Sequence, residues 1–232
     1  VALVFLAVAG NEKRAAAGLT RQNWKSAVLI VLAFVGIYIV RTVVSVAVQG
    51  VSDGSGMQYV KEWAAMFKNP MMWLNIAALP INYFFVFIAF FGEEYGWRYY
   101  LQPVLQKRFG LREGVIILGV VWGLWHIPDD LFYYTQTSGI QMIFAQQITC
   151  ISLGIFFAYA YMKTQNIWVP VCLHYLNNNL IPIISGTFSA DVLENQTVSW
   201  KDLPVALVLN GLCFGFFLLA DVFKKKEVQE EE

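Results

Sequence analysis

The chain has 232 residues, of which 58% are hydrophobic and only 14% are charged, and its formal net charge is zero. A soluble domain usually carries about 25% charged residues, so this deficit favours a lipid environment. The balanced charge provides no basic surface, and no nucleic-acid partner is expected. Three cysteines, Cys150, Cys172 and Cys213, lie in apolar runs without a C-x-x-C pair, which argues against a disulfide framework or a thiolate metal site.

Apolar runs that suit membrane helices recur along the chain. The first run, Val1–Ala9, is interpreted as the trimmed tail of a span and not as a signal peptide. Met57–Phe67 has aromatic residues among polar ones and predicts a short helix at the membrane interface. Six further runs follow the first, at Ser26–Gln49, Met71–Phe91, Gly114–Ile127, Ile140–Met162, Ile167–Ile184 and Pro204–Phe223.

These runs predict an all-α fold, a multi-pass transmembrane helical bundle of about six to seven membrane helices plus the interfacial helix. We expect one membrane domain over residues 1–223, with its motif-bearing core at 84–182, and a polar cytoplasmic tail at 224–232.

Basic residues predict the orientation of the bundle. Of the 16 Lys and Arg residues, twelve fall in loops on one side, three fall in loops on the other, and Arg41 lies in a span. The positive-inside rule then places the C-terminus and the segment Arg98–Arg112 on the cytoplasmic side of the membrane. If Arg98 lies inside the membrane instead, the bias is still eleven against three.

Charged residues inside membrane spans are costly and usually functional. The sequence from Glu93 to Arg98, EEYGWR, follows directly on an apolar run. On a helix, Glu94 and Arg98 are four residues apart and can pair, whereas Glu93 points about 100° away and stays free. The alternative interpretation is a cytoplasmic helix end with ordinary surface charges.

Both histidines of the chain lie in apolar segments. His126 ends its apolar run, where a hydrogen-bonded core histidine is the alternative to a catalyst. His174 and Asn178 share a helix face, and the run Asn177–Asn179 needs hydrogen-bond partners or a wet cavity in lipid. Polar contacts between helices are the alternative there. Arg41 is expected to extend toward a headgroup or to pair with an acid elsewhere.

The spacing of Glu93 and His126 predicts that they lie at similar depth. If the helix that contains Glu93 continues, a turn at Phe109–Leu111 joins it to the next span. At 1.5 Å per residue, both side chains lie roughly 23 Å from this turn in an antiparallel hairpin. Pro103 is expected to kink the first arm. His174 fits less well, at roughly 12 Å from the start of its helix.

The sequence contains three motifs, which are in chain order EEYGWR at 93–98, WGLWH at 122–126 and HYLNN at 174–178. This set resembles the CAAX-protease and bacteriocin-processing (CPBP, or Abi) family of intramembrane proteases, whose pattern is Glu-Glu-x-x-x-Arg, aromatic-x-x-x-His and His-x-x-x-Asn. The resemblance covers about residues 84–182 and uses both histidines. The chain departs from the family at Trp122, where the family usually has Phe.

The resemblance implies hydrolysis of a peptide bond near the C-terminus of a protein or peptide, or maturation of a small secreted peptide. It implies Glu94 and Arg98 as a structural pair. The catalytic residues that it implies are Glu93 as general base, His126 as its partner in activating water, and His174 and Asn178 as donors to the oxyanion. No Ser or Cys sits convincingly beside a histidine, so a covalent nucleophile is not expected.

A metal is the main alternative in this mechanism. Glu93, His126 and His174 would form a catalytic zinc set with an open position, and the family is often labelled a metalloprotease. The family is also described as using a metal-free glutamate mechanism, and the chain lacks His-Glu-x-x-His. We therefore favour no cofactor, with Zn²⁺ as the alternative. The expected partners are a peptide or protein substrate and the lipid bilayer.

Two other classes of function are open from the sequence. An ion- or proton-coupled transporter would use the intramembrane Glu, His and Arg as a relay, although no inverted repeat or matched pair of broken helices is visible. A non-catalytic membrane scaffold would use the same residues to hold helices together.

Overall fold

The computed structural model describes residues 17–19, 21–53, 56–185 and 194–224. The run Val1–Ala9 and all but Lys224 of the tail 224–232 lie outside the described residues. Within the described ranges the chain is built from helices and contains no strand. The predicted all-α fold is therefore confirmed.

The elements follow one another without any long excursion from the bundle. In chain order they are α3 (Trp24–Asp53), α4 (Gly56–Lys68), α5 (Pro70–Glu94), the π-helix η1 (Tyr95–Leu101), α6 (Gln102–Phe109), α7 (Glu113–Trp125), α8 (Ile127–Phe132), α9 (Gly139–Thr164), α10 (Trp168–Ser185), α12 (Asp202–Cys213) and the short 3-10 helices η2 (Gly215–Leu219) and η3 (Asp221–Phe223).

Four segments of the described chain are long and apolar enough to cross a membrane, namely Trp24–Ser45, Pro70–Phe109, Glu113–Phe132 and Gly139–Thr164. Their outer surface is apolar, and Phe84 and Phe85 on α5 are 72% and 73% exposed. Large apolar patches of this kind match lipid better than water. The multi-pass membrane fold is confirmed. The predicted number of six to seven spans stays a prediction, because α10 and α12 are not among the four segments that are long and apolar enough.

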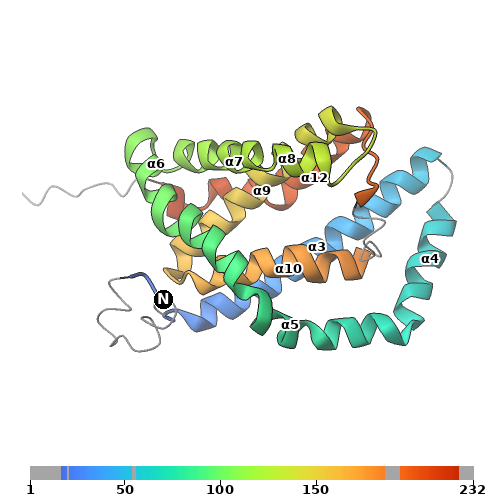
Figure 1. Cartoon of the computed structure of the whole chain (residues 1–232), viewed down its shortest axis with the longest axis horizontal. Coiled ribbons are helices and arrows are strands. Elements are labelled where there is room, and N and C mark those ends of the chain that lie inside the picture. Colours follow the sequence, from blue (N-terminus) through green and yellow to red (C-terminus); the bar gives the residue numbers. More distant parts are fainter. Residues whose placement is uncertain (1–16, 20, 54–55, 186–193, 225–232) are drawn as a thin grey trace, which may run out of the picture.

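Helix α9 forms the centre of the bundle (Figure 1). It packs against α3, α7, α8, α10 and α12 and carries more buried residues than any other described helix. A cluster of rings fills the space between α3, α9 and the C-terminal segment. Phe34 lies 5.5 Å from Phe156 and 5.8 Å from Phe214, measured between ring centroids. Helix α4 stands at one end and connects α3 to α5 (Figure 1).

The predicted hairpin is confirmed. Helix α6 packs against α7 after the turn at 110–112, and the rings of Trp97 and Trp125 meet across the hairpin at 6.2 Å. The first arm differs from an ordinary α-helix, because η1 has π-helical hydrogen bonding directly before Pro103. The ring of a proline clashes with the carbonyl four residues earlier, and the wider π turn relieves that clash.

The predicted last span, Pro204–Phe223, is wrong in its second half. The α-helix ends at Cys213, and Phe214 leaves it with φ of −123° and buries its ring in the aromatic cluster. The apolar run then continues as η2 and η3. Helix α12 also provides the partner of Arg41, whose Nε donates to Asn210 Oδ1 at 2.8 Å, so the partner is an amide and not the expected acid.

The close crossing of α7 and α9 depends on Gly119. A methyl group on Gly119 would lie 2.6 Å from Ile151 Cα, so the two helices would have to separate. We expect Gly119→Ala to lower the free energy of unfolding by about 1–3 kcal/mol, the usual cost of overpacking. Thermal unfolding in detergent measures the effect.

Gly36→Ala is the matched control, because this helical glycine has open space around the added methyl group. Alanine has the higher helix propensity, so this variant should be as stable as the original chain or more stable. Equal losses from Gly36→Ala and Gly119→Ala would contradict the crossing.

Candidate active site

The site is built around the buried carboxylate of Glu94, which ends α5. Arg98 Nε donates to Glu94 Oε2 at 2.8 Å, and His174 Nδ1 lies 2.9 Å from Glu94 Oε1. Glu94 and Arg98 are fully buried, and His174 is 3% exposed. Since a carboxylate only accepts, His174 donates its Nδ1–H to it. Glu94 therefore links two helices through Arg98 on η1 and His174 on α10.

Arg98 extends the same contacts to α7 and α9. Its Nη1 donates to the carbonyl oxygen of Gly154 at 3.2 Å, and its guanidinium carbon lies 5.3 Å from the centroid of the Trp122 ring. The negative faces of aromatic rings attract cations at this range. The structure thus places Arg98 inside the bundle and not in a cytoplasmic loop.

Trp122 lies between the two histidines. Its ring centroid is 5.9 Å from that of His126 and 5.4 Å from that of His174, both with edge-to-face geometry. The ring is 3% exposed. One buried aromatic side chain of α7 therefore sets the separation of His126, at the end of its own helix, and His174, on α10.

His126 lies at a break between two helices. Helix α7 ends at Trp125 and α8 begins at Ile127, with Pro128 in its first turn. Pro128 has no N–H to continue the α7 ladder, so the helix ends there. His126 Nδ1 lies 2.9 Å from the carbonyl oxygen of Trp122, to which it can only donate.

The hydrogen bonds of the two rings have the same chemical consequence. In each neutral histidine the proton sits on Nδ1, held by a carbonyl oxygen in one case and by Glu94 in the other. The Nε2 atom of each ring then has a free lone pair, which suits a base or a metal ligand.

Glu93 reaches the same neighbourhood through Cys150. Glu93 is half-buried, and its Oε2 is buried without a hydrogen-bond partner among the described residues. The Cys150 thiol lies in electrostatic range of the Glu93 carboxylate and 3.8 Å from His126 Nδ1. His126 therefore borders on this buried thiol, whereas no hydrogen bond among the described residues joins Glu93 to His126.

Asn178 is connected to α3 by a chain of hydrogen bonds. The Tyr38 hydroxyl donates to Asn177 Oδ1, and Asn177 Nδ2 donates to Asn178 Oδ1 at 2.8 Å. The Asn178 oxygen accepts this bond, and no hydrogen bond described for the structure uses the Asn178 Nδ2. Asn178 is exposed, in contrast to His174 one turn earlier.

The structure brings together Glu94, Arg98, His174 and Trp122 by contacts, and His126 contacts Trp122 and Cys150. No described contact joins Glu93 to His126. Asn178 lies one turn beyond His174 and contacts none of these side chains directly in the bonds described. Three neighbours were not singled out from the sequence: Asp130, Cys150 and Tyr38. Asp130 is fully buried, both its carboxylate oxygens lack partners, and it lies in electrostatic range of Cys150. Its place four residues after His126, next to Asp129, was the available signal.

The alternative zinc set of Glu93, His126 and His174 is not assembled in this structure. Within the described part of the chain, no group of three His, Cys, Asp or Glu side chains is placed to hold a metal ion. Glu93, His126 and His174 are all described and do not form such a group, so no step of the mechanism is derived through a metal.

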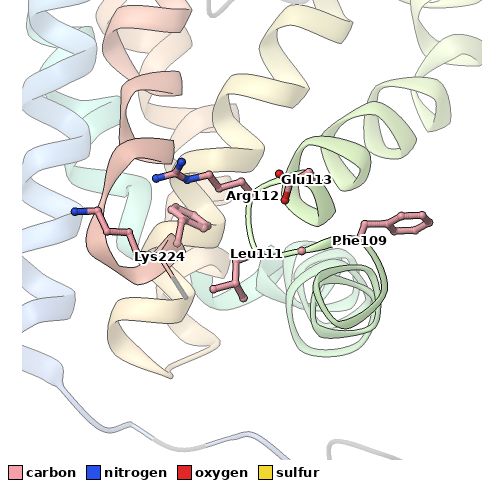
Figure 2. A pocket seen from close by; sticks show the side chains of 7 residues that line it. Phe109, Leu111, Arg112, Glu113 and Lys224 are labelled. Atoms are coloured by element: carbon pink, nitrogen blue, oxygen red, sulfur yellow. The ribbon is translucent and has the colours of Figure 1, made fainter. Parts of the chain in front are cut away.

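A cavity of about 440 Å³ lies at the turn between α6 and α7 (Figure 2). Its lining includes Phe109, Leu111, Arg112, Glu113 and Lys224. In Figure 2 the Phe109 ring points away from Arg112 and Lys224. The lining contains no predicted site residue, and Phe109 lies roughly 24 Å along the helix from Glu93. We therefore place the active site elsewhere.

Substitutions of the adjacent residues Glu93 and Glu94 should differ in their effect on the free energy of unfolding. Glu94→Gln leaves Arg98 as a buried charge without its anion, which typically costs about 3–5 kcal/mol. Glu93→Gln removes no ion pair of the described structure and should change the free energy of unfolding by less than about 0.5 kcal/mol. Thermal unfolding of both variants in detergent measures this difference, and similar losses would contradict the assignment of Glu94 as the supporting carboxylate.

Comparisons with known proteins agree with the order of the motifs. Residues 73–180 match the sequence model of the family described as Rce1-like, type II CAAX prenyl endopeptidase Rce1-like. CAAX prenyl protease 2 of Methanococcus maripaludis is 27% identical over 125 residues, which are 50% of this chain and 45% of that relative. The chain thus spans less than half the length of this curated relative. No solved structure matches it. The matched region contains all three motifs, so the comparisons support the resemblance of this part of the chain to the CAAX-protease and bacteriocin-processing family.

Proposed function

We propose that the chain is an intramembrane endopeptidase that hydrolyses a peptide bond of a protein or peptide substrate with water activated by Glu93 and His126. One observation carries this proposal. Glu93 has a buried carboxylate oxygen without a partner among the described residues, and His126 keeps its Nε2 free because its Nδ1 is held by a carbonyl oxygen. The family that the chain resembles supports the reaction type.

The chemistry requires a base, a nucleophilic water and donors for the developing negative charge. Glu93 accepts one proton from water while the oxygen attacks the carbonyl carbon of the scissile amide. His126 Nε2 accepts a hydrogen bond from the same water and orients it. When the tetrahedral intermediate collapses, the C–N bond breaks and Glu93 returns the proton to the leaving amine. The products are one carboxylate and one amine.

The donors for the oxyanion are Asn178 and His174. The Asn178 Nδ2 donates in no described hydrogen bond, and the bond from Asn177 to the Asn178 oxygen restrains the orientation of the amide. His174 donates from Nε2 only when the ring carries both protons, since its Nδ1–H points to Glu94. The Glu94 carboxylate provides the counter-charge for that form. Glu94 therefore has a second task in addition to holding Arg98.

We further propose that residues 1–223 form one membrane domain and that the C-terminus faces the cytoplasm. With Arg98 inside the bundle, the loop charges still favour this orientation by eleven to three. The partners in this proposal are the lipid bilayer and a peptide or protein substrate, and no cofactor takes part. The match to a peptidase family gives the transporter and scaffold alternatives no support.

The decisive variant is Glu93→Gln, assayed for peptide cleavage by the purified chain. Removing a general base typically costs about 10²–10⁴ in rate, so cleavage should fall at least about 100-fold while the fold is retained. Glu62→Gln, an exposed glutamate on α4, is the matched control and should cleave at the original rate.

Each assay is repeated with a chelator, and the original activity should be unchanged by it. Cleavage by Glu93→Gln at the original rate would refute the role of Glu93. Loss with chelator followed by rescue with Zn²⁺ would establish the zinc alternative. Solute uptake by proteoliposomes without any cleavage would favour a transporter.

The chain of hydrogen bonds from Tyr38 predicts a positioning role for that residue. Tyr38→Phe frees the Asn177 amide to rotate, and the loss of one such bond should lower kcat up to about tenfold with little change in KM. Asn178→Ala should lower kcat by about 10²–10³. In the double variant, Tyr38→Phe should add nothing further, because it acts only through Asn178.

Tyr100→Phe is the control, since Tyr100 is 69% exposed. Additive losses in the double variant would show that Tyr38 serves packing and not the orientation of Asn178.

A further inference from the structure

A cavity between α5 and α10 is lined by four asparagine side chains. Its volume is about 470 Å³, within the range of roughly 300–1,000 Å³ that is typical of ligand sites. Asn75 and Asn82 come from α5, and Asn178 and Asn179 from α10. The remaining lining residues are apolar, and no Lys, Arg, Asp or Glu of the described residues lines the cavity.

The position of the asparagines on α5 follows from helix geometry. Asn75 and Asn82 are seven residues apart, which is close to two full turns, so they lie on one face of the helix. Between them on α5 is Leu79, whose carbonyl oxygen accepts a hydrogen bond of 2.7 Å from the Tyr175 hydroxyl on α10. This bond keeps α5 and α10 together beside the cavity.

The folded structure uses only part of the hydrogen-bonding capacity of these asparagine amides. Asn82 Nδ2 donates to Asn179 Oδ1 at 3.4 Å, which is a long hydrogen bond, and Asn179 Nδ2 donates to the Tyr175 carbonyl at 3.0 Å. Asn75 makes no hydrogen bond within the described residues, although it lies in a segment apolar enough to cross a membrane. Polar groups in such segments normally find partners, so these amides have capacity for a ligand.

An extended peptide in the membrane requires hydrogen-bond partners of this kind. In lipid, every backbone N–H and C=O that leaves a helix costs several kcal/mol unless it finds a partner. A primary amide offers two donors and an acceptor side by side, which is the arrangement that a peptide bond requires. Charged side chains are absent from the lining that the structure describes, which matches an uncharged main chain better than a charged chain terminus.

We propose that this asparagine-lined cavity binds the extended main chain of the peptide substrate next to the scissile bond. The inference rests on the proposed function and deepens it, since the cavity shares Asn178 with the proposed oxyanion donors. The main chain of the substrate exchanges the hydrogen bonds of a helix for hydrogen bonds with Asn75 and Asn82. The cavity thus favours a substrate segment that can unwind from a helix. Its affinity should not depend on a charge at the terminus of the substrate.

The test measures binding separately from cleavage. A fluorescein-labelled, farnesylated peptide ending in Cys-Val-Ile-Met is titrated against the purified chain in the Glu93→Gln background, and Kd is read from fluorescence anisotropy. Asn75→Leu and Asn82→Leu should each raise Kd about tenfold, the equivalent of one lost hydrogen bond of about 1.4 kcal/mol. Gln136→Leu removes an exposed amide outside the cavity and should leave Kd unchanged.

A second measurement keeps the proposal testable if the leucine variants unfold. Peptides in which successive amide N–H groups are replaced by an ester oxygen are titrated against the Glu93→Gln chain and against Asn75→Ser. One ester replacement should weaken binding to the Glu93→Gln chain. The same replacement should have no further effect on binding to the Asn75→Ser variant. Equal Kd values for all variants, or equal effects of every replacement on both proteins, would overturn the proposal. Binding that depends on Asn75 without any cleavage by the original chain would retain this site and reject the peptidase function.

Discussion

The rest of the site depends on one buried interaction, the Glu94 carboxylate shared by Arg98 and His174. Two charges in the core of a membrane bundle have no water to solvate them, so each requires a partner with good geometry. Here the partners come from different helices, since Arg98 also contacts the Gly154 carbonyl on α9 and the Trp122 ring on α7. A shift of α7, α9 or α10 would break one of these contacts, although the Glu94–Arg98 pair lies within the α5–η1 arm, so the contacts restrain all three helices around this pair.

Interruptions of the helices place the remaining groups. The π turn of η1 begins directly after Glu94, and π turns inside α-helices frequently occur at functional sites. The break before Pro128 leaves His126 between two helices, with its Nδ1 held by the carbonyl of Trp122. Both interruptions lie next to a proline and next to a site residue. Pro128 ends α7 next to His126, and Pro103 lies two residues after the end of η1.

The sequence predicts those features that depend on the rise per residue of a helix and on the apolarity of a segment. The hairpin and the multi-pass bundle follow from these two quantities alone, and the similar depth of Glu93 and His126 stays a prediction. Features that depend on how helices rotate against one another were missed. Tyr38 and Asn177 are 139 residues apart, and the contact of Glu94 with His174 spans 80 residues. No local pattern encodes such contacts. The early end of α12 was missed because burial of the Phe214 ring outweighs continuation of an apolar helix.

Hydrogen-bond pairing separates supporting groups from available ones. The Glu94–Arg98 pair, the Arg41–Asn210 bond and the Tyr38–Asn177 bond satisfy polar groups that would otherwise destabilise a bundle in lipid. Glu93 Oε2, the Asp130 carboxylate and the Asn75 amide lack such partners among the described residues. An unpaired carboxylate or amide in this environment is costly, and the cost is recovered when a water or a peptide binds to it. We infer that the unpaired Glu93 carboxylate and Asn75 amide are the groups available to water and substrate, although Arg98 Nη2 and Asn210 Nδ2 are also buried without a partner among the described residues.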